Sequence, residues 1–278
     1  MPRRRTRGQK SIHDPASRSD KRPGPKSGSS DAVKQQDYLI YGMHAVQTLI
    51  DTQPERILQV RTTNADRLQP VLHQLRKLGL PVIDTDREAL SQLAGVDHHQ
   101  GVVATCKPKR MLNEEQAFAL LVKSGPLTVL VLDGLQDPHN LGACLRSADA
   151  TGVDLVIVPE HRAVGLTATV AKVAAGAMES VPVAQVTNIA RALAQLKSMG
   201  FWIAGTSDKA SASLFEYEFD PRTVLVMGAE GKGLRPLIEQ HCDQLISIPM
   251  QGIVSSLNVS VATGICLYER KRQQLNAQ

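Results

Sequence analysis

The chain has 278 residues, of which 42% are hydrophobic and only 3% aromatic, and its formal net charge is +5. This length suits one large domain or two modest ones. No apolar run approaches the length of a membrane span, and so few aromatic side chains argue against extensive base stacking of the kind used by RRM and OB modules.

The positive charge is concentrated at the start of the chain. Residues 1–36 contain ten Lys and Arg against three acidic residues, a formal charge of +7, so the rest of the chain carries −2. Because this stretch is also rich in Ser, Pro and Gly, we predict a disordered tail. Such a tail favours a polyanion through counterion release, although the composition also suits a tail that only confers solubility. It lacks the apolar core of a secretory signal.

The cysteines indicate the redox environment. Cys106, Cys144, Cys242 and Cys266 show no C-x-x-C spacing, so we expect a reduced, cytoplasmic chain with small buried thiols. No His or Cys pair has a second pair at zinc spacing, and we expect no metal site.

Residues 37–107 are predicted to form a small α/β domain. The predicted helices are Met43–Asp51 and Asp66–Leu78, and the predicted strands are Arg56–Arg61, Pro81–Asp84 and Val102–Thr105. The second helix has an apolar stripe consisting of Leu68, Val71, Leu72, Leu75 and Leu78. Gly79 follows it at a position typical of a left-handed helix cap. Further on, Thr85 and Glu88 have the spacing of a capping box.

Residues 108–126 are predicted to be a linker with a short helix over Glu114–Lys123, and residues 127–271 a second α/β domain. Its predicted strands are Thr128–Asp133, Leu155–Val158, Val181–Val186, Phe201–Thr206, Thr223–Met227 and Leu245–Ile248. Its predicted helices are Asn140–Thr151, Thr167–Ala175, Ile189–Ser198, Leu234–His241 and Ser256–Arg270. Alternating strands and helices, with continuously apolar strands, predict a doubly wound parallel sheet covered on both faces.

Three polar motifs follow strands of this second domain. They are Asp137-Pro-His-Asn140 with Arg146 downstream, Gly228-Ala-Glu-Gly-Lys-Gly233, and Ile248-Pro-Met with Ser256-Leu-Asn258 downstream. Ligands of open α/β sheets bind at the carboxyl ends of the strands. The three motifs together therefore predict one composite site.

Two nucleotide-binding patterns are excluded. The glycines at 228, 231 and 233 do not have the G-x-G-x-x-G order of a dinucleotide fold, and Leu234 and Arg235 replace the Lys and Ser/Thr of a P-loop. Glu230 inside a phosphate cradle would repel the ligand. Purely structural interpretations remain open for the individual residues: Asn140 is also a good N-cap, Arg146 also suits a solvated surface, and Ser256 and Asn258 also suit a helix start.

Taken together, the motifs resemble those of the SpoU/TrmH class (SPOUT) of RNA ribose 2′-O-methyltransferases. The pattern D-P-x-N-x-G…R matches Asp137–Arg146, G-x-E-G-x-G matches Gly228–Gly233, and I-P-M…S-L-N matches Ile248–Asn258. Tyr41-Gly-Met-His and His99-Gln-Gly-Val-Val are similar to segments of the bacterial enzymes that methylate a guanosine of 23S rRNA. The resemblance covers about residues 38–270.

This resemblance implies a fold and partners. It implies a small L30e-like domain that binds RNA, and a SPOUT domain whose parallel sheet carries a deep trefoil knot, a rare exception to the rule that chains do not thread. It also implies a homodimer, 23S rRNA as substrate and S-adenosyl-L-methionine as cofactor.

The resemblance further implies the site residues. The catalytic group is expected to be Asn140, Arg146, Glu230, Ser256 and Asn258; the cofactor is expected to contact Gly228, Ile248 and Leu257, and also Thr206, Met227 and Met250 at neighbouring strand ends. A ribose hydroxyl would attack the methyl group of a sulfonium, and positioning the two substrates contributes about 7–11 kcal/mol. Arg146 either accepts the hydroxyl proton or, because arginine normally stays protonated, binds the adjacent phosphate and stabilises the alkoxide. Two other functions stay open: a tRNA ribose methyltransferase of the same class, and a non-catalytic RNA-binding factor for ribosome assembly.

Overall fold

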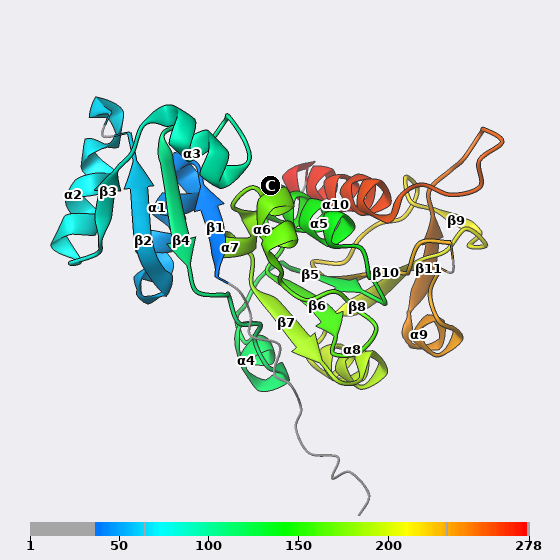
Figure 1. Cartoon of the computed structure of the whole chain (residues 1–278). Coiled ribbons are helices and arrows are strands. Elements are labelled where there is room, and N and C mark those ends of the chain that lie inside the picture. Colours follow the sequence, from blue (N-terminus) through cyan, green and yellow to red (C-terminus); the bar gives the residue numbers. More distant parts are fainter. Residues whose placement is uncertain (1–36, 64, 232, 277–278) are drawn as a thin grey trace, which may run out of the picture. The chain divides into compact units, whose positions relative to one another are not determined.

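The computed structural model describes residues 37–63, 65–231 and 233–276. The basic tail predicted over residues 1–36 therefore lies outside the described residues. Figure 1 labels the helices and strands in chain order.

Residues 38–106 contain a four-stranded mixed sheet with flanking helices (Figure 1). Its strands are β1 (Tyr38–Tyr41), β2 (Ile57–Thr62), β3 (Val82–Asp84) and β4 (Val102–Cys106), in the order β1-β4-β2-β3. Its helices are α1 (Met43–Thr52), α2 (Gln69–Lys77) and α3 (Arg87–Ala94), with 3-10 turns η1 (Pro54–Arg56) and η2 (Asp66–Leu68). Strand β4 is antiparallel to β1 and β2, and β3 is parallel to β2.

Two local predictions in this region are wrong. The N-cap of α3 is Asp86, whose Oδ1 accepts from the Ala89 amide at 2.8 Å, and not the preceding Thr85. A carboxylate interacts better than a hydroxyl with the positive end of a helix. Leu78 is 50% exposed, because it follows the last residue of α2 and has left the apolar stripe. Gly79 has the predicted left-handed conformation, with φ +69°.

Residues 127–276 contain a seven-stranded sheet in which every recorded pairing is parallel. Its strands are β5 (Leu127–Leu132), β6 (Leu155–Pro159), β7 (Val183–Val186), β8 (Trp202–Thr206), β9 (Ala212–Ser213), β10 (Arg222–Met227) and β11 (Gln244–Ser247). Their order is β7-β6-β5-β10-β8-β11-β9. Six of the strands were predicted; β9 has only two residues and was not.

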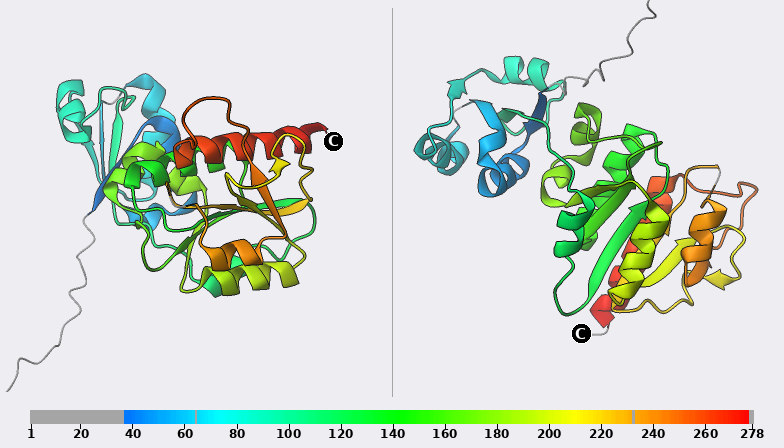
Figure 2. Two further views of the ribbon diagram at one scale, coloured as in Figure 1. Left: turned by 90° about the vertical axis from the view of Figure 1, so that its right-hand side faces the viewer. Right: turned by 90° about the horizontal axis from the view of Figure 1, so that it is seen from below.

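Helices cover both faces of this sheet, as the apolar strands predicted (Figures 1 and 2). On one face lie α5 (Pro138–Thr151), α6 (Ala168–Ala174), α7 (Ala177–Ser180) and α10 (Val259–Asn276); on the other lie α4 (Glu114–Ala119), α8 (Ile189–Ser198) and α9 (Pro236–His241). Successive residues of a strand face opposite sides. Accordingly, Leu130 and Leu132 join the first core, whereas Val129 and Val131 join the second.

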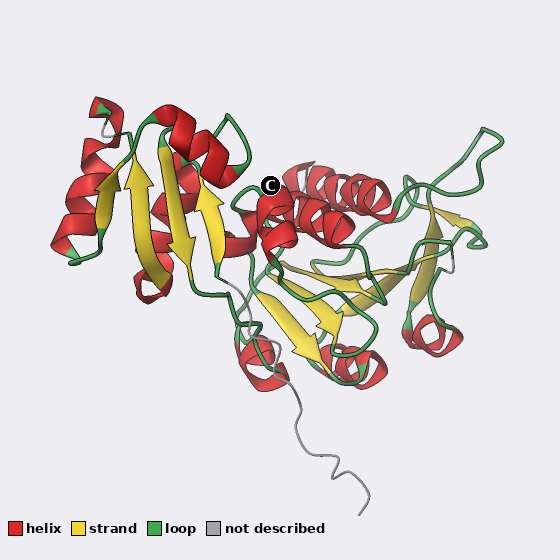
Figure 3. Ribbon diagram, in the orientation of Figure 1, coloured by secondary structure: helices red, strands yellow, loops and turns green. Residues whose placement is uncertain are grey.

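The starts of α5 and α10 differ from the prediction. Helix α5 begins at Pro138, with Asp137 as its N-cap, so Asn140 already lies in its first turn. Helix α10 begins at Val259 and not at Ser256. Side chains of Ser and Asn compete for backbone hydrogen bonds and favour helix starts over helix interiors, and residues 248–258 form a long loop instead (Figure 3).

A buried polar network connects the small sheet to α7. Arg56 forms a salt bridge with Glu179 of α7, and its Nη2 donates to the Tyr38 hydroxyl at 2.7 Å. The Lys109 ammonium donates to the carbonyl oxygens of Met178, Glu179 and Val181. Burial raises the pKa of Tyr38 to about 12 and lowers that of Lys109 to about 8.

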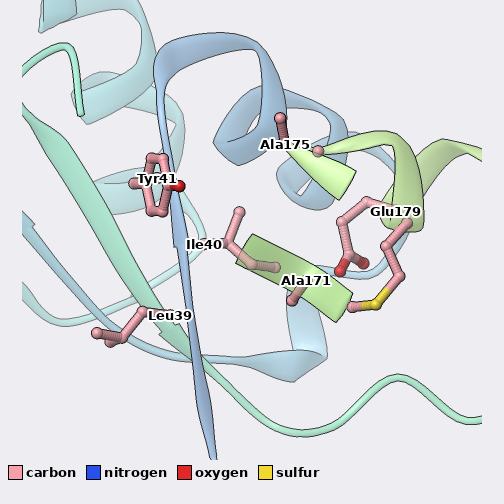
Figure 4. A pocket seen from close by; sticks show the side chains of 8 residues that line it. Leu39, Ile40, Tyr41, Ala171, Ala175 and Glu179 are labelled. Atoms are coloured by element: carbon pink, nitrogen blue, oxygen red, sulfur yellow. The ribbon is translucent and has the colours of Figure 1, made fainter. Parts of the chain in front are cut away.

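The same contact contains a small cavity between β1 and helices α6 and α7, lined by Ile40, Ala171 and Glu179 among others (Figure 4). Its volume is only about 10 Å³, roughly the minimum that holds one water molecule. It therefore belongs to the packing and is too small to admit a substrate.

Candidate functional site

The three motifs lie at the carboxyl edge of the seven-stranded sheet. The first follows β5, the second follows β10, which pairs directly with β5, and the third follows β11, two strands further along. The predicted composite arrangement is therefore present. The three motifs meet in side-chain contacts at one point.

That point is a chain of hydrogen bonds through Asn140. The Asn258 side-chain amide donates to Asn140 Oδ1 at 2.9 Å, and Asn140 Nδ2 donates to Glu230 Oε2 at 3.3 Å. Asn140 is only 8% exposed. Because Asp137 caps α5 through the His139 amide at 2.9 Å, Asn140 is not a cap and its side chain is available for the site. We call Asn140, Glu230 and Asn258 the amide cluster.

A second polar pair lies nearby and was not expected from the sequence. Arg235 donates from Nε to Asp133 Oδ2 at 2.9 Å and from Nη2 to Asp133 Oδ1 at 2.6 Å. The Asp133 side chain is 2% exposed and that of Arg235 53%. The hydrogen bond to Asp133 raises the pKa of Arg235. An acidic residue directly after the apolar run Val129–Leu132 was the available signal, because a carboxylate at such a buried position needs a cationic partner.

Asn140 and Glu230 of the amide cluster and both residues of the Arg235–Asp133 pair line one cavity of about 560 Å³ at the carboxyl ends of β5, β6 and β10. This volume is within the range of small-molecule sites. The described lining residues lie in three segments: residues 133–137 and Asn140 after β5, Pro159, His161 and Arg162 at the end of β6, and residues 229, 230 and 233–236 after β10. The rim includes the exposed side chains of His161 and Arg162.

The loop after β10 has a tight internal geometry. Gly233 donates its amide to the Ala229 carbonyl at 2.9 Å, and a Cβ on Gly228 would overlap the backbone of Gly233 and Leu234. Gly228 is thus required by the fold of its own loop. The contact between Gly228 and a cofactor that the sequence indicated stays a prediction.

The six residues expected to contact a cofactor lie at or just beyond the carboxyl ends of β8, β10 and β11, or before α10. They are Thr206, Met227, Gly228, Ile248, Met250 and Leu257. Met227 is buried, whereas Thr206, Gly228, Ile248 and Leu257 are half-buried and Met250 is 40% exposed. Strands β10, β8 and β11 are neighbours, and none of these six residues is among those that line the cavity of about 560 Å³.

Two expected catalytic residues are not part of the amide cluster. Ser256 is exposed in the loop before α10 and makes no hydrogen bond among the described residues. Arg146 is also exposed, and within the described part of the chain it forms no hydrogen bond or ion pair. Six helical residues rotate its side chain about 120° from that of Asn140. Its guanidinium lies near Tyr41, where it opposes the rise in the Tyr41 pKa that burial causes.

Burial sets the properties of the four cysteine thiols. All four cysteines are free; burial raises the thiol pKa of Cys144 to about 11 and those of Cys106, Cys242 and Cys266 to about 12. Among the residues that the structure describes, no group of three or more His, Cys, Asp or Glu side chains could hold a metal ion. In the same residues, no helix has the length and hydropathy needed to cross a membrane.

Solved structures define the class of fold. The SpoU methyltransferase AviRb from Streptomyces viridochromogenes, crystallised with the cofactor AdoMet, superposes with a TM-score of 0.69 at 22% identity, covering 86% of this chain and 91% of that one. A structure described as an RNA 2′-O ribose methyltransferase has a TM-score of 0.69 at 29% identity, covering 87% of this chain and 90% of that one. The fold is therefore that of the SPOUT methyltransferases.

The sequence comparisons are more specific. Residues 127–268 match the model of the SpoU rRNA Methylase family, and residues 39–112 match the RNA 2′-O ribose methyltransferase substrate binding model. The chain belongs to the SpoU rRNA methylase family, which confirms the resemblance seen in the motifs.

Curated relatives are similar over most of the chain. The 23S rRNA (guanosine-2′-O-)-methyltransferase RlmB of Vibrio vulnificus (strain CMCP6) is 47% identical over 243 residues, 86% of this chain and 98% of that protein. The enzyme of the same description from Escherichia coli (strain K12) is 48% identical over 239 residues, 85% of this chain and 98% of that protein.

Proposed function

We propose that this protein transfers a methyl group from S-adenosylmethionine to the ribose 2′-hydroxyl of a guanosine in 23S rRNA. The observation that carries the proposal is the amide cluster: three motifs distant in sequence join their polar side chains beside a cavity of about 560 Å³. Relatives with this activity in their descriptions are nearly half identical to the chain.

The residues at the ends of β8, β10 and β11 suit the cofactor. Half-buried Ile248 and Leu257 offer apolar contact, and Thr206 and the Gly228 backbone offer polar contact, which together match an adenosyl group with its apolar ring and polar sugar. When bound, the cofactor supplies the electrophilic methyl group. We infer that these residues hold it, with Met227 and Met250 beside them.

The amide cluster is suited to orient the ribose. Asn140 is fixed by hydrogen bonds to both Asn258 and Glu230, so its position is set before substrate arrives, and such preorganisation is a large part of catalysis by positioning. Ser256 adds a hydroxyl near the start of α10. We infer that the Arg146 guanidinium stabilises the alkoxide that develops as the ribose hydroxyl loses its proton.

A homodimer explains how Arg146 reaches a site. Helix α10 exposes an apolar stripe with a seven-residue spacing, Val261, Tyr268 and Leu275, each more than half exposed, and it packs against α5, which carries Arg146. We infer that a second copy covers this stripe and that Arg146 serves the site of that copy. Val261→Glu should dissociate the dimer in sedimentation experiments. Leu237→Glu, an equally exposed apolar site on α9, should not; a Val261→Glu protein that stays dimeric would contradict the stripe assignment.

The other parts of the chain take supporting roles in the proposal. We infer that residues 37–107 form an L30e-like domain that binds RNA, that residues 108–126 link it to a knotted SPOUT domain over residues 127–271, and that the tail of residues 1–36 adds electrostatic affinity. A cytoplasmic location follows from the ribosomal substrate.

The test is to incubate the purified full chain with S-adenosylmethionine and unmodified 23S rRNA, tRNA or 16S rRNA, and to analyse nucleosides by mass spectrometry. We expect 2′-O-methylguanosine in 23S rRNA only, at one position that fragment mapping identifies. Methylation of tRNA instead would favour the tRNA enzyme of the same class. Binding of rRNA without methylation of any RNA would favour the assembly factor.

A further inference from the structure

The Arg235–Asp133 pair has no role in the mechanism above, yet it lines the same cavity as Asn140 and Glu230 of the amide cluster. We propose that Arg235 recognises the guanine base of the target nucleoside by donating to its O6 and N7 atoms. This inference rests on the proposed function and adds the residue that selects the base.

The salt bridge to Asp133 leaves one edge of the Arg235 guanidinium available to a ligand. Asp133 occupies the edge formed by Nε and Nη2. The edge formed by Nη1 and Nη2 therefore has donors to spare, and no described residue accepts a hydrogen bond from Nη1. Two parallel donors at this spacing match the O6 and N7 acceptors of guanine, the commonest specific contact between arginine and a base.

The Asp133 carboxylate makes this edge rigid. With its side chain only 2% exposed, Asp133 holds Arg235 through two charge-assisted hydrogen bonds, which are roughly twice as strong as neutral ones. A half-exposed arginine without such a partner would lose side-chain entropy on binding. Here the guanidinium is already oriented before a ligand arrives.

The charge of the cavity favours a base over a phosphate. Its lining contains three carboxylates, Asp133, Asp137 and Glu230, against the guanidinium groups of Arg162 and Arg235. The formal charge of the Asp, Glu and Arg side chains among the described lining residues is −1, and Asp133 directly neutralises Arg235. An anion gains little in such a cavity, whereas a neutral base with two acceptors still gains both hydrogen bonds.

The same arrangement discriminates against adenine. Adenine presents an amino group where guanine has O6, and two donors would then face each other. The carboxylates of Asp137 and Glu230, which line the same cavity, are acceptors of the kind that the N1 and N2 hydrogens of guanine require.

The test uses single-atom changes in the RNA. Once the methylated guanosine has been mapped, synthetic RNA is made with guanosine or 7-deazaguanosine at that position, since the latter lacks only the N7 acceptor. For the unaltered protein we expect single-turnover methylation to fall by about 10-fold to about 100-fold on the deaza RNA, the cost of one hydrogen bond to a charged donor.

The variants then assign the effect to one residue. Arg235→Gln should methylate guanosine RNA more slowly and should lose the sensitivity to 7-deazaguanosine, with less than about a twofold difference between the two RNAs. Arg235→Lys keeps the charge but not the fork, so it should also lose most of the sensitivity. Arg162→Gln changes the other arginine that lines the cavity. This variant should retain the sensitivity to 7-deazaguanosine.

Several outcomes would overturn the inference. Equal rates of the unaltered protein on both RNAs, or full sensitivity in Arg235→Gln, would show that Arg235 does not contact N7. If Arg235→Gln lowered the methylation rate equally on both RNAs and made the salt dependence of RNA binding shallower, Arg235 would contact a phosphate instead. Failure of the proposed function is distinct, because the unaltered protein would then methylate no guanosine at all.

Discussion

The two halves of the carboxyl edge differ in how their functional side chains are held. Around β5 and β10, each important side chain has a partner: Asp133 holds Arg235, and Asn140 joins Glu230 and Asn258. In the loop after β11, by contrast, Ile253 is fully exposed and Ser256 makes no hydrogen bond among the described residues.

This difference shows which part of the site a single chain can build alone. The cavity side is preorganised, because hydrogen bonds within the chain fix its geometry before any ligand binds. Residues 250–256 of the loop after β11 and Arg146 of α5 are exposed, and we expect them to gain partners from the cofactor, the RNA or a second copy. Variants on the two sides should therefore fail in different ways.

Arg146 belongs to the unpartnered side, and its loss should have the largest effect. If its guanidinium stabilises the alkoxide, Arg146→Ala should reduce single-turnover methylation by about 10²-fold or more. Thermal stability and cofactor affinity should not change, because the side chain is exposed and makes no hydrogen bond with any described residue. Arg146→Lys keeps the charge but loses the planar fork, so it should rescue poorly. A near-normal rate for Arg146→Ala at saturating RNA and cofactor would show that the residue is not catalytic.

A substitution at Gly228 tests whether the shape of the loop after β10 determines cofactor binding. In Gly228→Ala the added methyl group overlaps the backbone of Gly233 and Leu234, and local strain of about 1–3 kcal/mol should weaken S-adenosylmethionine binding about 5-fold to about 150-fold in calorimetry. The matched control is Gly252→Ala in the loop after β11, where the nearest atom is 4.0 Å away. Equal affinities for the two variants would mean that the shape of the loop does not determine cofactor binding.

Substitution of Asn140 tests whether this residue positions the substrate or stabilises the fold. Asn140→Ala breaks the amide cluster, and we expect about a 10-fold lower methylation rate, the cost of about one hydrogen bond, with little change in melting temperature. Asn113→Ala is the control, for which we expect a change in stability and not in rate. It removes the N-cap of α4, which accepts from the Gln116 amide at 2.8 Å, and should lower stability by about 1 kcal/mol without changing the rate. If Asn140→Ala instead lowered stability and spared the rate, Asn140 would be structural.

The contrast also explains what the sequence could predict. The order of strands and helices followed from apolar periodicity, and Ile189–Ser198 forms α8 with the predicted bounds. The motifs indicated Asn140, Glu230 and Asn258. However, Asp133–Arg235 joins residues 102 positions apart, and nothing in local spacing indicates which arginine a buried carboxylate will meet.

Helix starts were less predictable for a related reason. Asp137 and Asn140 are both good N-caps, and so are Thr85 and Asp86, so propensity alone could not choose between them. In α5 the choice matters for function, because Asp137 caps the helix and Asn140, in the first turn, joins Glu230 and Asn258. Tertiary contacts decided the outcome in a region where local preferences were nearly equal.

The tail of residues 1–36 should have the smallest effect on methyl transfer. It carries a formal charge of +7 while the rest of the chain carries −2, so its deletion should weaken RNA binding and flatten the salt dependence. The slope of log K against log salt should change by about 0.7–0.9 for each phosphate that the tail neutralises. The rate at saturating RNA should stay the same, because the amide cluster and the cavity lie wholly within residues 133–258.

A full-length variant with Gln in place of Arg3, Arg4, Arg5 and Arg7 should give an intermediate slope, which separates charge from chain length. An unchanged slope after deletion would show that the tail does not touch the RNA, and a lower rate at saturating RNA would show that it acts on the site itself.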